Sequence, residues 1–463
     1  MKYGIEDIKM RIVIAGCGKI GQSMIHSLVS EGHEIVVIDS DREVIDSVTT
    51  NYDVMGICSQ ATSCKALTEA NVGSAELFIA AADSDDINML SCFLAKRMGA
   101  KHTVARIRSG EYTNSDLDFM KKQLELSMVI NPERLTAKAI YDILKFPSAV
   151  KCESFTRSRF EMAEMFVKPG SVLDGVSLSD LRSRSGGSFL VCAVLRGKSA
   201  HIPRGTFILR GGDRIGLIAA PDDMQKLLNN LGILQKRAKH VFLLGASRIA
   251  GYLSEELIRS GNSVKIIEKD EKRCDEISAQ LGGGAVVIHG DGAQHEVLDE
   301  EGLASADAFV ALTGMDEENL LISYYALDHG VPKVVAKLNQ EAYHELGEQL
   351  GVECTVSPKR ITADVILQYA RALQSSMGSR VETLYSLMNG TVEALEFAVS
   401  SDFEYTNIPL KDLKLKPDIL LAGIIRGSKN IIPGGEDVIK PDDRVIIIAA
   451  GRKLCDLSDV IEQ

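Results

Sequence analysis

The chain has 463 residues, which at ordinary domain sizes is enough for two to four domains with their own cores. Hydrophobic residues make up 45% and charged residues 25%, a composition typical of a globular protein and not of a collagen-like, disordered or coiled-coil chain. The formal net charge is −12, and the chain has neither tryptophan nor a long run of Lys and Arg, so we do not expect it to bind nucleic acid.

The cysteines and the N-terminus indicate a cytoplasmic setting. The nine cysteines include no C-x-x-C pair, so they predict neither a disulfide framework nor a zinc knuckle. Residues 1–10 lack the apolar core of a secretory signal, and no stretch approaches the ~20 apolar residues that cross a bilayer. We therefore expect any contact with a membrane to be peripheral.

Residues 10–147 alternate short β runs with helix-length amphipathic segments, which predicts a Rossmann-like, doubly wound parallel sheet with helices on both faces. The β runs are Ile12 to Ala15, Ile35 to Ile38, Leu77 to Ala81 and Thr103 to Ile107. A proline-led helix, Pro132 to Phe146, is expected to end this domain. It either relays motion to the next domain or is an ordinary packing helix.

The first β run leads into Gly16-Cys17-Gly18-Lys19-Ile20-Gly21, which fits G-x-G-x-x-G and opens an amphipathic helix. Gly16 permits a tight turn, Gly18 lets a pyrophosphate approach the backbone, and Gly21 allows close helix packing. Asp39 ends the next β run, where its carboxylate can accept hydrogen bonds from an adenosine ribose and would repel a 2′-phosphate. We predict NAD(H) binding here, with a purely structural βα turn as the alternative.

Residues 150–231 contain turn-bounded β runs and one closing helix, which predicts a small α+β module. The basic segment 231–239 is expected to join two halves, because the chain then repeats itself. Pro358-Lys-Arg-Ile-Thr362 answers Pro132-Glu-Arg-Leu-Thr136, and Arg426 and Asp443 answer Arg196 and Asp213. We expect four domains, at 10–147, 150–231, 239–375 and 380–463.

The second glycine loop is degenerate. In Gly245-Ala246-Ser247-Arg248-Ile249-Ala250, Ser247 replaces the glycine nearest the phosphate, whereas Ala250 is an accepted variant at the last position. Glu268 preserves the acid that Asp39 supplies in the first half. Either this loop binds a nucleotide of a different kind or affinity, or the domain is retained as a scaffold.

Two cations occupy matching places at the predicted carboxyl edges of the sheets, where open α/β sheets bind ligands. Arg106 follows Thr103-Val-Ala, and Lys337 follows Val334-Val-Ala. Each either meets a ligand phosphate or is a solvated side chain at a strand end. Ala82 and Asp83 follow another β run and are expected to line the same crevice as Arg106.

The remaining chemistry-bearing residues give little sign of catalysis. His289 and His295 are interpreted as part of a surface turn, with a metal site as the weaker alternative, and Cys17 as a small packing residue and not a reactive thiol. No H-E-x-x-H, G-x-S-x-G or Walker A motif occurs. We therefore expect a protein that is not an enzyme, with an NAD-dependent cytosolic dehydrogenase as the alternative.

The tandem organisation resembles the TrkA family, the cytosolic regulatory subunits of Trk potassium-uptake systems, which carry two potassium-conductance-regulating domains. The resemblance covers residues 10–460 and is carried by the first glycine loop with Asp39, the runs Ala82-Asp83-Ser-Asp-Asp-Ile-Asn88 and Ala105-Arg106-Ile-Arg108, and the paired Arg-Gly…Pro…Asp-Arg modules. A nucleotide sensor that controls a different system is a further alternative.

The resemblance implies NAD(H) or another adenine nucleotide, ATP or ADP, at Gly16, Gly18, Gly21, Asp39, Ala82, Asp83 and Arg106, with an analogous second site. It also implies a ring-like homo-oligomer at the cytoplasmic face of the membrane, beneath a potassium-translocating subunit. Ser247 and Ala250 depart from the family pattern, as does Ser59-Gln60-Ala61, which replaces the turn kept as Gly290-Asp291-Gly292. Which half binds which nucleotide, and whether the small modules bind a further ligand, stays open.

Overall fold

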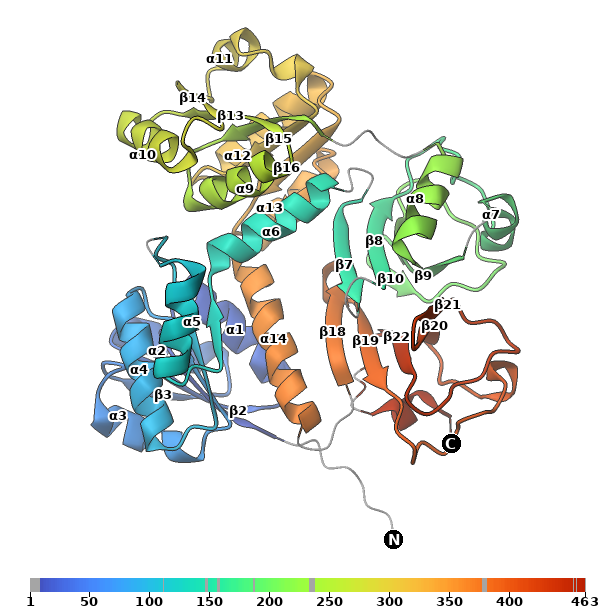
Figure 1. The fold of residues 1–463 in the computed structure, drawn as a ribbon, viewed down its shortest axis with the longest axis horizontal. Coiled ribbons are helices and arrows are strands. Elements are labelled where there is room, and N and C mark those ends of the chain that lie inside the picture. Colours follow the sequence, from blue (N-terminus) through green and yellow to red (C-terminus); the bar gives the residue numbers. More distant parts are fainter. Residues whose placement is uncertain are drawn as a thin grey trace. The chain divides into compact units, whose positions relative to one another are not determined.

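The structure is a computed structural model that describes residues 9–110, 112–145, 149–155, 159–185, 188–232, 238–376, 381–452, 454 and 456–462 (Figure 1). The chain forms two compact units. The first comprises Met1–Ala137 with Ser357–Ala370, and the second comprises Lys138–Val356 with Arg371–Gln463. The units therefore do not coincide with the two sequence halves. Most of the expected joint, residues 233–237, lies outside the described residues.

The first unit contains a six-stranded parallel sheet in the order β3-β2-β1-β4-β5-β6. Its strands are β1 (Arg11–Ala15), β2 (Glu34–Asp39), β3 (Met55–Cys58), β4 (Leu77–Ala80), β5 (His102–Arg106) and β6 (Met128–Ile130). Its helices are α1 (Lys19–Ser30), α2 (Arg42–Asn51), α3 (Cys64–Glu69), α4 (Asp85–Met98), α5 (Asn114–Gln123) and the start of α6 (Pro132–Lys145). The predicted doubly wound fold is confirmed. We call this sheet with α1–α5 the first α/β domain.

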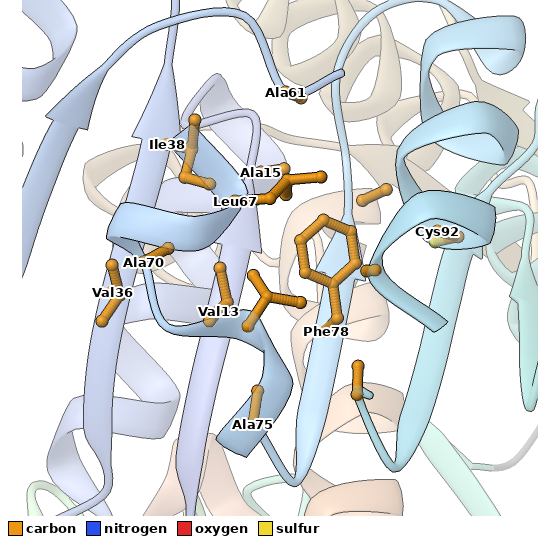
Figure 2. Packing of buried hydrophobic residues seen from close by; sticks show 14 of the residues in the cluster. Val13, Ala15, Val36, Ile38, Ala61, Leu67, Ala70, Ala75, Phe78 and Cys92 are labelled. Atoms are coloured by element: carbon orange, nitrogen blue, oxygen red, sulfur yellow. The ribbon is translucent and has the colours of Figure 1, made fainter. Parts of the chain in front are cut away.

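Helices pack against this sheet through a dense apolar core. Figure 2 shows the ring of Phe78, from β4, among side chains of the neighbouring strands and of α3 and α4. Phe78 is completely buried, as are Val13 and Leu67. Burying a side chain of this size contributes about 1.5–3 kcal/mol. The core fixes the strand ends from which the functional loops emerge.

The second unit contains a six-stranded sheet with the same order, β14-β13-β12-β15-β16-β17. Its strands are β12 (His240–Leu244), β13 (Ser263–Glu268), β14 (Val286–His289), β15 (Ala308–Ala311), β16 (Lys333–Lys337) and β17 (Cys354–Val356). Its helices are α9 (Arg248–Arg259), α10 (Glu271–Leu281), α11 (His295–Glu300), α12 (Asp316–Asp328) and α13 (Glu341–Gln349). The predicted internal repeat is thus present in three dimensions. We call this part the second α/β domain.

Two antiparallel modules complete the second unit. The first module contains β7 (Lys151–Phe155), β8 (Phe160–Phe166), α7 (Leu178–Ser185), β9 (Phe189–Arg196), β10 (Ser199–His201), β11 (Arg214–Ala219) and α8 (Pro221–Asn230). The second contains β18 (Val381–Leu387), β19 (Val392–Ala398), β20 (Ile419–Arg426), β21 (Lys429–Ile431) and β22 (Arg444–Ala450). One apolar cluster, which includes Phe160 and Ile448, joins them.

The helix α14 (Pro358–Ser376) connects the second α/β domain to the second module, and most of it belongs to the first unit. There, Ser23 Oγ lies 3.4 Å from the carbonyl oxygen of Lys359, and the ring of Tyr369 meets that of His102 edge to face. The boundary between the units likewise falls inside α6. Within the described ranges, no helix has both the length and the apolar character needed to span a bilayer.

Candidate functional site

The first glycine loop requires glycine at two positions for steric reasons. Gly16 has φ +93°, and a Cβ there would lie 2.4 Å from the backbone nitrogen of Ala82. A Cβ on Gly21 would lie 2.1 Å from the carbonyl oxygen of Gly16. By contrast, a Cβ on Gly18 would meet nothing within 4 Å. Gly18 therefore borders open space, which a ligand can fill by approaching the backbone closely.

Gly18 is also the N-cap of α1, and it provides no side-chain cap for that helix. Lys19 and Ile20 begin the helix, so their N–H groups lie among the first-turn donors that lack a partner inside an α-helix. Such a helix start is a binding site for an anion such as a pyrophosphate. The loop therefore has the features expected of a dinucleotide site.

Asp39 lies beside this loop at the end of β2. Its Oδ2 accepts a hydrogen bond from the N–H of Cys17 at 2.6 Å, and its Oδ1 accepts one from the N–H of Asp41 at 3.0 Å. Each carboxylate oxygen has two acceptor sites, so both retain capacity for a ribose hydroxyl. The backbone thus holds the Asp39 carboxylate beside the glycine loop.

Cys17 is fully buried within the loop. Burial, followed by the nearby charge of Asp39, raises the pKa of the Cys17 thiol to about 12. A thiol with this pKa stays protonated at neutral pH and is a poor nucleophile. The structure therefore favours the packing role over the reactive thiol.

Arg106, at the end of β5, is 6% exposed. Its Nη1 donates to the carbonyl oxygens of Ala81 and Ala82 at 3.3 and 3.4 Å and lies 3.6 Å from Oδ1 of the exposed Asp83. Its Nε is buried and has no hydrogen-bond partner among the described residues. Burial, and then the charge of Arg108, lowers the pKa of Arg106. A buried guanidinium with an unused donor is suited to an added anionic or carbonyl ligand.

Asn88, on α4, was missed as a site residue by the sequence analysis, although the first site depends on it. Its Oδ1 accepts from the N–H of Ala82 at 2.8 Å, and its Nδ2 donates to the carbonyl oxygens of Ala82 and Arg106 at 2.8 and 2.9 Å. This buried amide thereby ties the loop after β4 to the end of β5. Asn319 makes the matching contacts with Thr313 and Lys337. The recurrence of the asparagine in both halves was the available signal.

The second α/β domain repeats the arrangement around the acid. Gly245 also has φ +93°, and Glu268 accepts from the N–H groups of Ala246 and Asp270 at 2.6 and 2.9 Å. The helix start differs, because Ser247 is the N-cap of α9 and its Oγ lies 3.4 Å from the N–H of Ala250. In the second loop the N–H of Ala250 is thus engaged by the serine cap, whereas the first loop has no side chain that caps its helix start.

A pocket of about 330 Å³ lies at this edge of the second sheet. Lys337 lines it, and Lys337 Nζ donates to the carbonyl oxygen of Thr313. Burial lowers the pKa of Lys337, and the charge of Asp316 opposes that effect. The lining residues come from the ends of β12, β13, β15 and β16, from the turn Gly290-Asp291-Gly292, and from the first turns of α10 and α12. Glu268 and Lys337, predicted from sequence, therefore lie in one crevice.

The two histidines singled out earlier have separate local contacts. A ring nitrogen of His289 lies 3.1 Å from the carbonyl oxygen of Lys269, and His295 stacks on Tyr325 with ring centroids 3.9 Å apart. Among the residues that the structure describes, no group of three or more potential ligands is arranged to hold a metal ion.

Comparison with known proteins gives matches over most of the chain. The TrkA-N domain family matches residues 12–132 and 241–358, and the TrkA-C domain family matches residues 162–232 and 394–458. The Trk system potassium uptake protein TrkA homolog of Archaeoglobus fulgidus is 31% identical over 440 residues, covering 95% of this chain and 97% of that protein. The Trk system potassium uptake protein TrkA of Vibrio alginolyticus is 28% identical, covering 97% and 98%.

Among solved structures, the GsuK channel bound to NAD matches with a TM-score of 0.61 and 17% identity, covering 96% of this chain and 78% of that one. The isolated GsuK RCK domain matches with a TM-score of 0.60 and 16% identity, covering 96% and 93%. At these identities the matches show a shared fold.

Proposed function

This chain belongs to the TrkA family, and from that premise we propose that it is a nucleotide-binding regulatory subunit of a potassium-uptake transporter. The observation that carries the proposal is the first site. There, an uncapped helix start, a fixed ribose acceptor and a buried guanidinium with an unused donor occur in one α/β domain. The relatives named as potassium uptake proteins supply the transport system.

NAD(H) is the proposed ligand of the first site. Its pyrophosphate would be held by the loop from Gly16 to Gly21, including the N–H groups around Gly18, and its adenosine ribose by Asp39. Arg106, with Ala82 and Asp83, would border the end of the dinucleotide that lies away from the adenosine ribose. The second pocket, with Gly245, Ser247, Ala250, Glu268 and Lys337, is proposed as a second nucleotide site, for which ATP and ADP are alternatives to NAD(H). NAD(H) can carry a hydride, but we propose that it acts here as a signal and is not consumed.

The regulatory output is proposed to be a change in how the α/β domains are arranged. A ligand biases such an equilibrium only if it binds one arrangement better than the other. We propose that the chain assembles into a ring at the cytoplasmic face of the membrane, beneath the potassium-translocating subunit. The segments α6 and α14, where the chain passes from one unit to the other, are the proposed relay. The domain limits 10–147, 150–231, 239–375 and 380–463 remain part of this proposal.

Binding is tested with Asp39→Ala, matched by Asp53→Ala at an exposed carboxylate outside the site. Losing hydrogen bonds to a charged acceptor should weaken NAD(H) binding about ten- to a hundredfold, measured by calorimetric titration. Asp53→Ala should bind like the wild type. Equal affinities for Asp39→Ala and wild type would overturn the assignment.

Regulation is tested by potassium uptake in cells that carry the cognate transporter with the wild type, Asp39→Ala, Asp53→Ala or no chain. We expect uptake to be lost without the chain and altered by Asp39→Ala alone. Uptake that is the same in all four strains would exclude the regulatory role. Incubation with NADH and a panel of ketones, keto acids and aldehydes should leave the absorbance of NADH unchanged, and enzyme-dependent oxidation would restore the dehydrogenase alternative.

A further inference from the structure

The two α/β domains differ in charge where the second strand of each sheet ends. Asp39 and Glu268 conserve the acid at that point, but Ser40 of the first domain is replaced by Lys269 in the second. Four residues further on, Val44 is replaced by Arg273. Both cations line the 330 Å³ pocket together with Glu268. The second site therefore has two positive side chains beside its ribose acceptor, where the first has none at the same positions.

The backbone around these positions is the same in both domains, so the difference lies in the side chains. Asp41 caps α2 by accepting from the N–H groups of Glu43 and Val44 at 2.9 and 3.5 Å. Asp270 caps α10 by accepting from the N–H groups of Lys272 and Arg273 at 3.0 and 3.2 Å. Arg273 is thus held in the first turn of α10, at the place that Val44 has in α2.

The formal charge at the ribose end is less negative in the second site than in the first. Asp39 gives −1 in the first site, whereas Glu268, Lys269, Arg273 and Asp291 together give 0 in the second. The Glu268 carboxylate accepts from two backbone N–H groups, as Asp39 does, so what distinguishes the second site is that Lys269 and Arg273 offset the repulsion between this acid and a 2′-phosphate. Asp291 lies in the turn after β14, the strand that pairs with β13, whereas Glu318 lines the pocket from α12.

The glycine loops differ in the number of backbone N–H donors left open at the helix start, and here the first site has more. The first leaves its helix start uncapped, whereas Ser247 caps α9 in the second. A nucleotide in the second pocket would thus find one donor fewer at its pyrophosphate and two additional cations beside its adenosine ribose. In Rossmann domains, an arginine near the ribose acceptor is the feature that accommodates a 2′-phosphate.

We infer that the second α/β domain binds an adenine nucleotide phosphorylated on the 2′-oxygen of its ribose, with NADP(H) as the dinucleotide form, and that Lys269 and Arg273 hold the 2′-phosphate. This inference rests on the proposed function, which makes the crevice a nucleotide site. The chain would then respond to two different pools, NAD(H) through the first domain and NADP(H) through the second.

The experiment exchanges the distinguishing residues between the two domains of the full-length chain. Lys269→Ser with Arg273→Val gives the second site the residues of the first, and Lys272→Ala removes a neighbouring cation on the same turn that does not line the pocket. Calorimetric titrations with NADPH and NADH are performed for each variant. We expect the double variant to bind NADPH at least tenfold more weakly while its NADH affinity changes less than threefold, and Lys272→Ala to bind both like the wild type.

Competition assays separate a 2′-phosphate from phosphate in general. Adenosine 2′,5′-bisphosphate should displace NADPH at least tenfold more effectively than ADP. Both compounds carry two phosphates, but ADP carries both of them on its 5′-oxygen. Equal displacement by the two compounds would overturn the inference in favour of a 5′-polyphosphate site. Urea unfolding of each variant verifies that the exchange preserves the fold, and Lys269→Met with Arg273→Met, which keeps the alkyl stems, replaces the double variant if it does not.

Different results would overturn NADP(H) binding by the second α/β domain and nucleotide binding by the chain as a whole. If NADH binds in a manner that depends on Asp39 but NADPH binds nowhere, or binds the double variant unchanged, only the inference is overturned. If the wild type binds neither dinucleotide, the proposed function falls with it.

Discussion

Three glycines, two in the first α/β domain and one in the second, separate the free-energy cost of a left-handed backbone from the cost of steric crowding. Gly16 and Gly32 have backbone φ angles of +93° and +80°, values that residues other than glycine rarely adopt. A Cβ on Gly32 would meet nothing within 4 Å, whereas one on Gly16 would lie within 2.4–2.7 Å of the Ala81–Ala82 backbone. Gly245, the counterpart of Gly16, has its nearest backbone neighbours at 3.2–3.3 Å.

We therefore expect graded losses of stability for substitution by alanine. Gly32→Ala should cost about 1–2 kcal/mol, since it adds only the strain of a left-handed backbone. Gly245→Ala should cost slightly more, and Gly16→Ala about 3 kcal/mol or more, because the backbone after β4 must move. Urea unfolding, followed by intrinsic tyrosine fluorescence, measures the shifts. A shift for Gly16→Ala no larger than that for Gly32→Ala would contradict the steric explanation of this loop.

The first module contains a buried carboxylate whose contribution depends on pH. Asp213 is 1% exposed, and Arg196 Nε and Nη2 donate to its two oxygens at 2.7 Å each. Burial alone would raise the pKa of Asp213, but hydrogen bonds from Arg196 and from the N–H of Arg210 bring it below its usual value. Because the pKa is lower in the folded state, the stabilisation is present above the unfolded pKa of about 4 and is lost as pH falls through the folded pKa.

Asp213→Asn should accordingly destabilise the protein at pH 7 by about 1–3 kcal/mol, because it leaves the guanidinium of Arg196 without its ionised partner. The difference from the wild type should shrink as the pH falls below about 4 and Asp213 itself becomes protonated. Unfolding curves at pH 7, 4 and 2.5 test this. A difference that stays constant over that range would show that the charge of Asp213 does not contribute.

At the scale of elements, the strands were more predictable than the contacts between them. Runs such as Ile35 to Ile38 are apolar on both faces, as buried parallel strands must be. Because the sequence repeats, each strand was indicated by two independent runs, one in each half. The recurrence of Asn88 as Asn319 marks the residue in the sequence, but its contacts could not be predicted, because they depend on β4 and β5 lying side by side. The passage of α14 into the first unit was equally hidden, since an amphipathic helix does not specify which sheet it covers.

Matching helices of the two α/β domains expose matching apolar residues. Leu90 on α4 and Leu321 on α12 occupy equivalent positions and are 50% and 63% exposed. Phe119 on α5 and Leu346 on α13 form a second pair, at 64% and 40%. Isolated exposed apolar residues are common, but these recur at equivalent positions of a repeat, so we expect them to form the interface of the proposed ring.

Leu90→Asp with Phe119→Asp should therefore reduce the size of the assembled particle, because a charge would be buried at the interface between copies of the chain. Sedimentation velocity or light scattering measures the change. Val172→Asp is the control, since Val172 is 57% exposed on the first module and its counterpart is Asp402. An unchanged particle for the helix variant, or an equal loss for the control, would assign assembly to other surfaces.

At the scale of the whole molecule, a single guanidinium connects the second α/β domain with both modules. Arg214 Nε lies 2.6 Å from Oε2 of the buried Glu164, and Arg214 Nη1 lies 3.4 Å from Oε1 of Glu348 on α13. The other oxygen of Glu164 accepts from the N–H of Met388, at the end of β18 in the second module. The start of α13 is in turn held near the pocket, because Asp316 accepts from the N–H of Gln340.

A second ion pair, which joins α13 to the first module through an exposed lysine, provides the comparison that tests this connection. Lys198 and Glu345 lie 3.4 Å apart, but their side chains are 92% and 68% exposed, and such pairs contribute little. We expect nucleotide binding at the second pocket to change hydrogen exchange in β8 and β11, and Glu348→Gln to reduce that change by at least half without altering nucleotide affinity more than threefold. Glu345→Gln should leave the change intact, because it removes only a solvent-screened contact. Hydrogen exchange followed by mass spectrometry, with and without saturating nucleotide, measures both variants. Equal effects of the two substitutions would mean that α13 acts on the first module through its general packing and not through Arg214.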